Sequence, residues 1–294
     1  MRPVHRQADS TAAWEVARPS RVTAPPGVDM AGFRIHGDSS VALRAIPHPA
    51  VTVAVDFGDR PFDVQGPAGR IRSKGLVAGL AFGAFRVCAE SVACVQVRLS
   101  PLVAHPVLGV PLAELRGSVI ALDDLWGRDV RRLRERLHLA RTWPERFALV
   151  EAELSTRLRA GRTADPEVAW AWHRIVAGRG RVRVSDLAAR TGWSRQRMWS
   201  RFGSQIGVPP KRAAMLVRFD HAVHRLVRGH APARVAADGG YADQSHLHHD
   251  VHAFTGTTPT AAANEPWLAV DDRAWPVRGG ANPDAEAGRG HREP

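Results

Sequence analysis

The chain has 294 residues, of which 44% are hydrophobic and 24% charged, a composition typical of an ordinary folded protein with room for about two domains. It carries 41 Lys and Arg against 29 Asp and Glu, a formal net charge of +12 at pH 7. No apolar run approaches the roughly 18 residues that span a bilayer, and no apolar signal core follows residues 1–6. Its two cysteines, Cys88 and Cys94, argue against a disulfide framework. We therefore expect a cytoplasmic, nucleoid-associated protein that does not enter a membrane.

The first third of the chain has the pattern of a β domain. Residues 1–30 contain several prolines and no clear periodicity, and we expect them to be disordered. Residues 32–109 consist of short runs rich in β-branched side chains, of which 51–57 is the clearest, separated by glycines. The runs 76–85 and 92–99 flank a turn-forming Ala-Glu-Ser segment, which suits a hairpin. The region predicts a small β-barrel or sandwich.

Beyond Pro111 the apolar spacing changes to the period of a helix. Val130, Leu133 and Leu137 share one helical face, and a second stripe begins at Phe147. These helices could pack on the β domain or against a second subunit. Glycine, threonine and proline between residues 161 and 166 predict a linker, after which a helix over 167–177 opens a second domain.

Two blocks of the second domain occur twice. Residues 187–193 are echoed by 235–241, at an offset of 48, and residues 207–210 by 256–259, at an offset of 49. Self-similarity at a nearly fixed spacing indicates a duplicated supersecondary unit. Residues 165–263, which contain it, hold 14 Lys and Arg against 7 Asp and Glu. This excess points to a polyanionic partner, although 39 of the 41 basic residues are Arg, a bias that weakens the charge argument.

Each copy has the pattern of a helix–turn–helix. In the first, Ser185 and Asp186 offer an N-cap for a short helix, Gly192 suits the turn, and Ser194 caps the next helix. In the second, Gly240 and Asp243 take the last two roles. The inward stripes are Met198 and Phe202 in the first copy and Leu247, Val251 and Phe254 in the second.

A helix from Pro209 to about Arg228 joins the two copies, with a buried stripe from Met215 to Leu226. About 18 helical residues make a rod of roughly 27 Å. Adjacent major-groove openings on one face of DNA lie about 34 Å apart, so such a rod could place one outward helix in each.

These residues resemble a known family. The sequence from Ala188 to Ser194, the segment 202–211, and above all the segments 240–247 and 254–259 are similar to the AraC/XylS-type transcriptional regulators. That resemblance covers about residues 167–262 and implies two helix–turn–helix units on a linker helix. A looser likeness of residues 101–111 to one subgroup of the family implies ligand sensing or dimerisation in the first domain.

The outward faces of the second helix in each copy are the predicted DNA contacts. By resemblance, base contacts would come from Gln196, Trp199 and Ser200 in one copy, and from Gln244, Ser245 and His249 in the other. Members of the family often carry Arg at Gln196, Ser200 and His249, which puts the usual base preferences in doubt; Trp199 could instead pack against the linker helix. The complete predicted DNA-binding set is Ser194, Arg195, Gln196, Arg197, Trp199, Ser200, Arg201, Asp243, Gln244, Ser245, His248 and His249.

Metal and catalytic chemistry have weaker support. His246, His249 and Asp250 share a helical face, but they lie inside the recognition-helix match, and we expect no metal there. No His-x-His pattern with a following Glu at cupin spacing accompanies His36, His48 or His105, and phosphate-loop, nucleophile-elbow and zincin motifs are missing. We therefore expect no catalytic residues and no cofactor.

Taken together, the sequence predicts an α+β protein. The expected parts are a disordered segment at 1–30, a cupin-like β-barrel with helices at 31–162 for effector binding or dimerisation, a tandem helix–turn–helix domain at 165–263, and a disordered tail at 264–294 in which Trp267 and Trp275 dock locally. The expected function is a sequence-specific DNA-binding transcription regulator that binds two adjacent major-groove segments of double-stranded DNA. A small-molecule effector, a homodimer and contact with RNA polymerase are further expectations. The alternative is a ligand-binding or enzymatic barrel with the helices as an accessory module.

Overall fold

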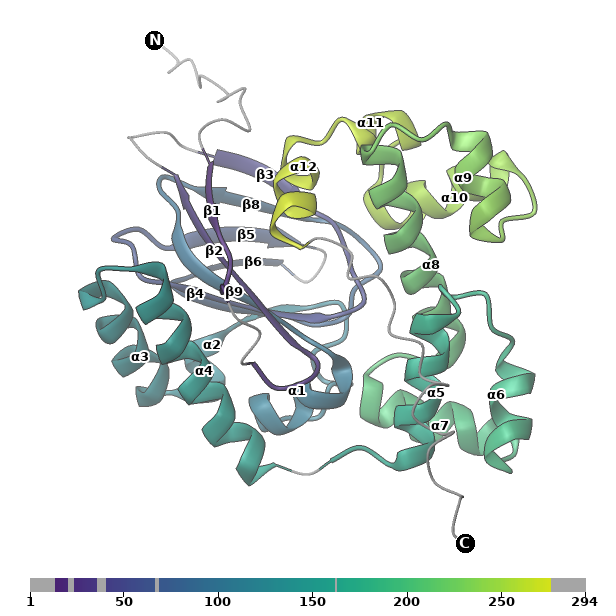
Figure 1. Cartoon of the computed structure of the whole chain (residues 1–294), viewed down its shortest axis with the longest axis horizontal. Helices are drawn as coiled ribbons and strands as arrows, with labels where there is room; N and C mark the ends of the chain where they lie inside the picture. Colours follow the sequence, from purple (N-terminus) through teal and green to yellow (C-terminus); the bar gives the residue numbers. More distant parts are fainter. Residues whose placement is uncertain (1–13, 21–23, 36–40, 67–68, 162, 276–294) are drawn as a thin grey trace, which may run out of the picture.

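The computed structural model describes residues 14–20, 24–35, 41–66, 69–161 and 163–275. A β-rich part lies beside a helical part, and the long helix α8 (Pro210–Val227) runs through the middle of the latter (Figure 1). Within the described ranges, no helix is both long and apolar enough to cross a membrane.

The described strands form two antiparallel sheets rather than one closed barrel. The strands of the six-stranded sheet follow one another in the order β1 (Trp14–Ala17), β2 (Val28–Ile35), β9 (Ala93–Leu99), β4 (Val51–Asp56), β7 (Gly75–Ala78) and β10 (Val119–Ala121). The four-stranded sheet holds β3 (Val41–Ala45), β8 (Phe85–Ala89), β5 (Phe62–Gly66) and β6 (Gly69–Ser73). The α+β class is confirmed, and the β domain is a two-sheet arrangement instead of the expected barrel.

Strand β9 shows how sequence alternation builds this domain. Because successive side chains of a strand point to opposite faces, Val95 and Val97 join a core under the helices, while Gln96 and Arg98 face a cavity between the sheets. Both faces of the six-stranded sheet are therefore covered.

The outer face of that sheet is covered by helices. They are α1 (Pro101–Leu108), α2 (Leu122–Trp126), α3 (Arg128–Leu139) and α4 (Trp143–Ala160). The predicted stripes are confirmed, since Val130, Leu133, Leu137 and Phe147 are all buried in the core formed with the sheet. These apolar faces cover the sheet of the same chain, so they do not need a second subunit.

The expected hairpin is wrong. Strands β8 and β9 are consecutive, but β8 pairs with β3 and β5 whereas β9 pairs with β2 and β4, so the chain crosses from one sheet to the other at residues 90–92. Because β9 is apolar on the helix-covered face and lines a cavity on the other, it suits the centre of the larger sheet. A short turn segment between two apolar runs does not distinguish a hairpin from a crossing between sheets.

Over the described residues after 163, the helical part consists of eight further helices. They are α5 (Pro166–Ala177), α6 (Val184–Thr191), α7 (Arg195–Ile206), α8, α9 (Pro232–Gly239), α10 (Gln244–Thr255), α11 (Pro259–Ala263) and α12 (Pro266–Ala274). Their shared core centres on α8, where the ring of Phe219 stacks on that of Phe254 with centroids 4.4 Å apart.

Both expected disordered ends are partly ordered, and those predictions are wrong over the described residues. Residues 14–17 form β1, which pairs with β2, and residues 266–274 form α12. The proline-rich composition did not predict either element, because each is stabilised by contacts with distant residues. The ring centroid of Trp267 in α12, for example, lies 5.2 Å from that of Trp14 and 5.3 Å from that of Phe33. Residues 1–13 and 276–294 lie outside the described ranges.

Candidate functional site

The first helix–turn–helix consists of α6 and α7. Gly192 has φ of 69°, the left-handed conformation that the tight turn after α6 requires. The Ser194 hydroxyl caps α7 by accepting a hydrogen bond from the Arg197 amide at 3.1 Å, as predicted. The predicted cap of the first helix is wrong, since α6 begins at Val184 and Ser185 and Asp186 lie inside its first turn.

The second unit, α9 and α10, repeats this arrangement. Gly240 has φ of 74°, and the Asp243 carboxylate caps α10 by accepting from the His246 amide at 2.7 Å. The inward stripes of both units are fully buried as predicted; they contain Met198, Phe202, Leu247, Val251 and Phe254.

Helix α8 fixes the spacing of the two units. It has 18 residues, so its length is roughly 27 Å. Arg218 on α8 donates to the Asp250 carboxylate of α10 at 2.7 Å, and its guanidinium lies 4.7 Å from the centroid of the Tyr241 ring in the turn. Asp250 is only 4% exposed. Its carboxylate therefore ties α10 to the linker, a role that the sequence did not reveal.

The predicted contact residues lie together on the outer surfaces of α7 and α10 and their caps. Trp199 is 58% exposed and so lies outside the core. All twelve predicted residues are exposed: Ser194, Arg195, Gln196, Arg197, Trp199, Ser200, Arg201, Asp243, Gln244, Ser245, His248 and His249. Each unit therefore presents the N-terminal part of its second helix to solvent.

Two of the predicted arginines have partners within the domain. Arg201 donates through Nε to the Asp165 carboxylate at 2.9 Å, and the Arg197 guanidinium lies 4.8 Å from the centroid of the Trp193 ring. These contacts orient the two side chains beside the exposed face of α7. Asp165 precedes α5 and lies far from α7 in the sequence, so no local pattern predicted this pair.

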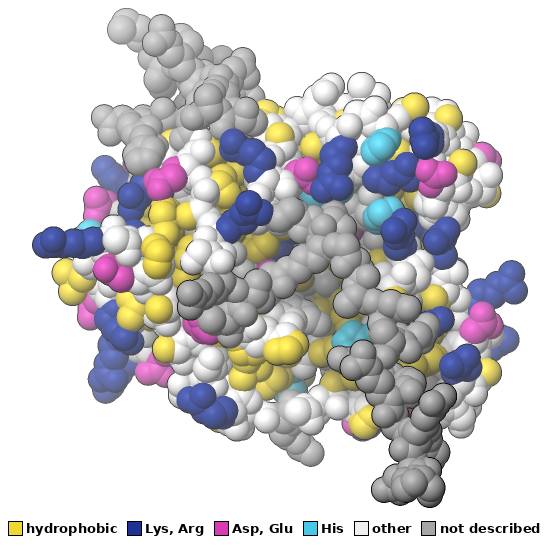
Figure 2. All heavy atoms as spheres, in the orientation of Figure 1, with side chains coloured by type: hydrophobic (Ala, Val, Ile, Leu, Met, Phe, Trp, Pro, Cys, Tyr) yellow, Lys and Arg dark blue, Asp and Glu magenta, His cyan; other side chains and the backbone are white. Residues whose placement is uncertain are grey.

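Basic side chains gather around the units. Figure 2 shows Lys and Arg side chains along the edge of the molecule formed by α6, α9 and α10. Exposed basic residues near the first unit are Arg179, Arg181, Arg183, Arg190, Lys211 and Arg212. The carboxylate of Asp238 is paired with an arginine: a hydrogen bond from Arg225, at 2.7 Å, lowers the pKa of Asp238 and keeps it ionised beside that guanidinium. Such a surface suits phosphate groups.

The β domain contacts the C-terminal end of each second helix with an arginine. Arg116 Nε donates to the carbonyl of Gly207, directly after α7, at 2.6 Å, and Arg44 Nη1 donates to the carbonyl of Thr255, the last residue of α10, also at 2.6 Å. Gly207 and Gly256 are equivalent positions of the repeat. The β domain is thus tied to the C-cap glycine of the first unit and to the residue just before the C-cap glycine of the second.

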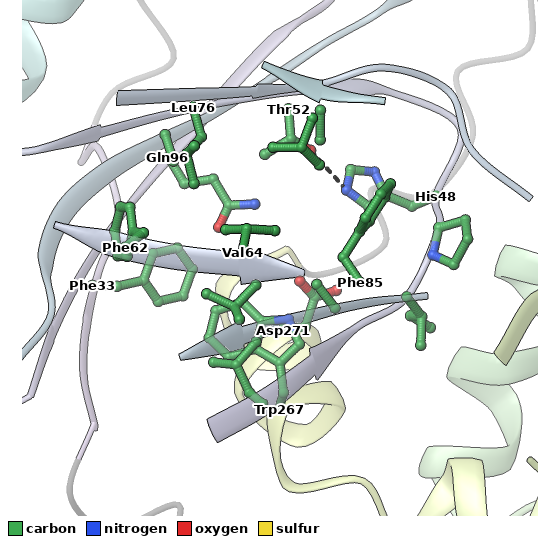
Figure 3. Close-up of a pocket in the computed structure, with 18 of the residues that line it drawn as sticks. Phe33, His48, Thr52, Phe62, Val64, Leu76, Phe85, Gln96, Trp267 and Asp271 are labelled. Carbon is green, nitrogen blue, oxygen red and sulfur yellow. Dashed lines mark hydrogen bonds between the residues drawn. The ribbon is translucent and has the colours of Figure 1, made fainter. Parts of the chain in front are cut away.

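A cavity opens between the two sheets (Figure 3). Its empty volume, which includes an open mouth, is about 1150 Å³. Strands of both sheets form most of its wall, and α8 and α12 complete it through Asp220, His224, Trp267 and Asp271. The sequence suggested a ligand-binding domain, but nothing in it indicated that the C-terminal helices line the cavity.

Comparisons with known proteins agree with the helical part. Residues 187–265 match the family model described as a helix-turn-helix domain. A stretch of 66 residues is 33% identical to the uncharacterized HTH-type transcriptional regulator YbfI of Bacillus subtilis (strain 168), and it covers 22% of this chain and 24% of that protein. The chain thus matches about a quarter of the length of this relative.

Solved structures give weaker likenesses. ToxT from Vibrio cholerae O395 aligns with 81% of this chain and 98% of its own at 10% identity and a TM-score of 0.47. The AraC-like transcriptional activator CuxR aligns with 80% of this chain and 90% of its own at 14% identity and a TM-score of 0.26. At TM-scores below 0.5, these likenesses support no inference about function or ligand.

The caps, turns, buried stripes and linker define residues 184–255 as two helix–turn–helix units on one rod. The domain belongs to the helix–turn–helix class. It is an AraC-type helix–turn–helix domain, as the family match and the earlier sequence resemblance both indicate.

Proposed function

We propose that the protein is a sequence-specific transcription regulator that binds double-stranded DNA through α7 and α10. The supporting observation is that both helices expose their predicted contact residues and are joined by an 18-residue helix. A helix of that length spans roughly 27 Å, which is of the order of one DNA turn. Gln and His side chains at such surfaces hydrogen-bond base edges, and the surrounding arginines pair with phosphates.

We further propose that a small molecule bound in the cavity controls this activity. The cavity wall includes side chains of the linker helix, so a ligand would touch both the β domain and the DNA-binding domain. A homodimer and a contact with RNA polymerase stay predictions.

Selection from a pool of random duplexes tests the DNA-binding proposal. The full chain is expected to enrich one sequence with two constrained segments whose centres lie about one helical turn apart. Binding to that duplex should weaken steeply with salt, because each neutralised phosphate releases counterions. Enrichment of no sequence, or equal affinity for single-stranded nucleic acid, would contradict the proposal.

An enzymatic β domain is the second candidate, since a cavity of this kind could also transform a ligand. A regulator is expected to return its ligand chemically unchanged after long incubation. Turnover by the purified full chain would favour the enzyme instead.

A further inference from the structure

The cavity between the sheets has an apolar body and one polar end. The apolar body is formed by six side chains from both sheets and α12: Phe33, Phe62, Val64, Leu76, Phe85 and Trp267. The polar end contains His48, Gln96, Arg98, Asp220, His224 and Asp271. Of these, Figure 3 labels His48, Gln96 and Asp271. A ligand with a mostly hydrocarbon skeleton and few polar atoms matches this division.

The polar end has no spare positive charge among the described wall residues. Arg98, its only arginine, donates to the Asp271 carboxylate at 2.5 Å. Burial, with the Arg98 and His224 charges as smaller causes, holds the pKa of His48 well below its usual value, so this imidazole is neutral at pH 7. The His224 ring of the wall already lies 3.2 Å from the Asp272 carboxylate. A carboxylate ligand would therefore find no unpaired cation and would lie close to Asp220 and Asp271.

A cationic ligand is disfavoured as well. Asp220 is the remaining carboxyl group of the wall, and burial raises its pKa, which lowers its capacity to act as a counter-ion. The His224 ring lies 3.8 Å from the Asp220 carboxylate. Transfer of an ammonium group from water into this mostly apolar space costs more free energy than its interactions with such a site would restore.

Uncharged polar atoms of a ligand, by contrast, would find hydrogen-bond partners in the cavity wall. The Gln96 amide points into the cavity, and it has no hydrogen bond to any residue in the described ranges. The buried Nε of Arg98 also lacks a partner there. An amide can both donate and accept, so a hydroxyl or carbonyl group of a ligand could satisfy it.

Helix α12 connects this cavity to the linker helix. Asp271 faces the cavity and pairs with Arg98. The next residue, Asp272, accepts at 2.7 Å from Arg228, directly after α8, and lies 3.2 Å from the His224 ring of α8. Val270 is 1% exposed and packs between α12 and the sheets. A ligand that contacts Trp267 or Asp271 therefore acts on the same helix that contacts α8 through Asp272.

We infer that the cavity binds an uncharged, largely apolar molecule whose hydroxyl or carbonyl group forms a hydrogen bond with Gln96. We infer further that this binding changes the position of the DNA-binding helices through α12. Only the coupling to the DNA-binding helices rests on the proposed function. Binding itself can be measured without DNA, so the two can fail separately.

Three probes with one skeleton test the ligand class: phenylbutanol, phenylbutanoate and phenylbutylamine, titrated into the full chain by calorimetry at pH 7. Phenylbutanol is expected to bind at least about tenfold more tightly than either charged analogue. Equal or tighter binding of a charged analogue, or binding of none of the three, would overturn the inference.

Variants place the binding in the cavity. Ala54→Phe fills the space from β4 and should abolish phenylbutanol binding, while Ala148→Phe, on the exposed face of α4, should not change it. Gln96→Leu keeps the side-chain size and should weaken binding about tenfold, because the polar group of the probe loses its partner. Unchanged binding in both Ala54→Phe and Gln96→Leu would remove the cavity from consideration.

Coupling through α12 is tested with the DNA selected by the protein. Saturating phenylbutanol should change the DNA dissociation constant at least about fivefold. Asp272→Asn, which weakens the contact with Arg228, should keep probe binding and lose that change. If DNA binding is absent altogether, hydrogen exchange of the α12 and α8 amides still reports the coupling; exchange that does not respond to the probe refutes it.

Discussion

Replacing Gln244 and His249 together with Ala is expected to lower discrimination between the selected DNA site and random DNA by about thirtyfold or more. Both side chains are exposed on α10 beside its capped N-terminus. A good base contact contributes about 1–3 kcal/mol of discrimination, and two such contacts contribute at least about 2 kcal/mol. Affinity for random DNA should change little, because the substitutions leave the phosphate-binding arginines intact.

The matched control is the pair Gln65→Ala and His138→Ala, which removes the same residue types from exposed positions of the β domain. Competition binding with selected and random duplexes measures both proteins. A double variant at Gln244 and His249 that discriminates as well as the control would show that α10 does not recognise bases through these side chains.

Asp250→Ala is expected to destabilise the second unit by about 3 kcal/mol or more. Asp250 is 4% exposed, and its carboxylate accepts from Arg218 at 2.7 Å. Removing one partner of a buried pair leaves the other charge uncompensated, which costs about 3–5 kcal/mol. Native-state hydrogen exchange of the α8 and α10 amides measures this change locally, so the two-domain chain need not unfold in one step.

Asp238→Ala is the control for that experiment. Asp238 makes an equally short ion pair with Arg225, at 2.7 Å, but its side chain is 50% exposed. Solvent screens an exposed pair, so the loss should be much smaller than that of Asp250→Ala. Equal losses in the two variants would mean that the Arg218–Asp250 pair does not hold α10 on the linker.

The helix–turn–helix units could be predicted from sequence because their determinants are local. The Ser194 and Asp243 caps, the Gly192 and Gly240 turns and the inward stripes each depend on a few neighbouring residues. The repeat then supplied a second, independent copy of the same signals. The roles of the exposed side chains in contacting DNA stay predictions.

The β domain was harder to predict, because strand pairing depends on residues far apart in the chain. The apolar runs around β8 and β9 were identified, but their separation into two sheets follows from what covers each face. The same holds for α12. The two tryptophans indicated local docking of the tail, but Asp271 pairs with Arg98, 173 positions away, and the sequence did not predict that residues 266–274 form an ordered helix.

The central claim, that two helices occupy adjacent major grooves, is tested most directly by chemical interference on the selected duplex with the full chain. Methylation of guanine N7 and ethylation of phosphates report major-groove and backbone contacts at each position. We predict two clusters of interfering positions on one face of the duplex, centred about 34 Å apart. A single cluster, or interference confined to the minor groove, would contradict the account.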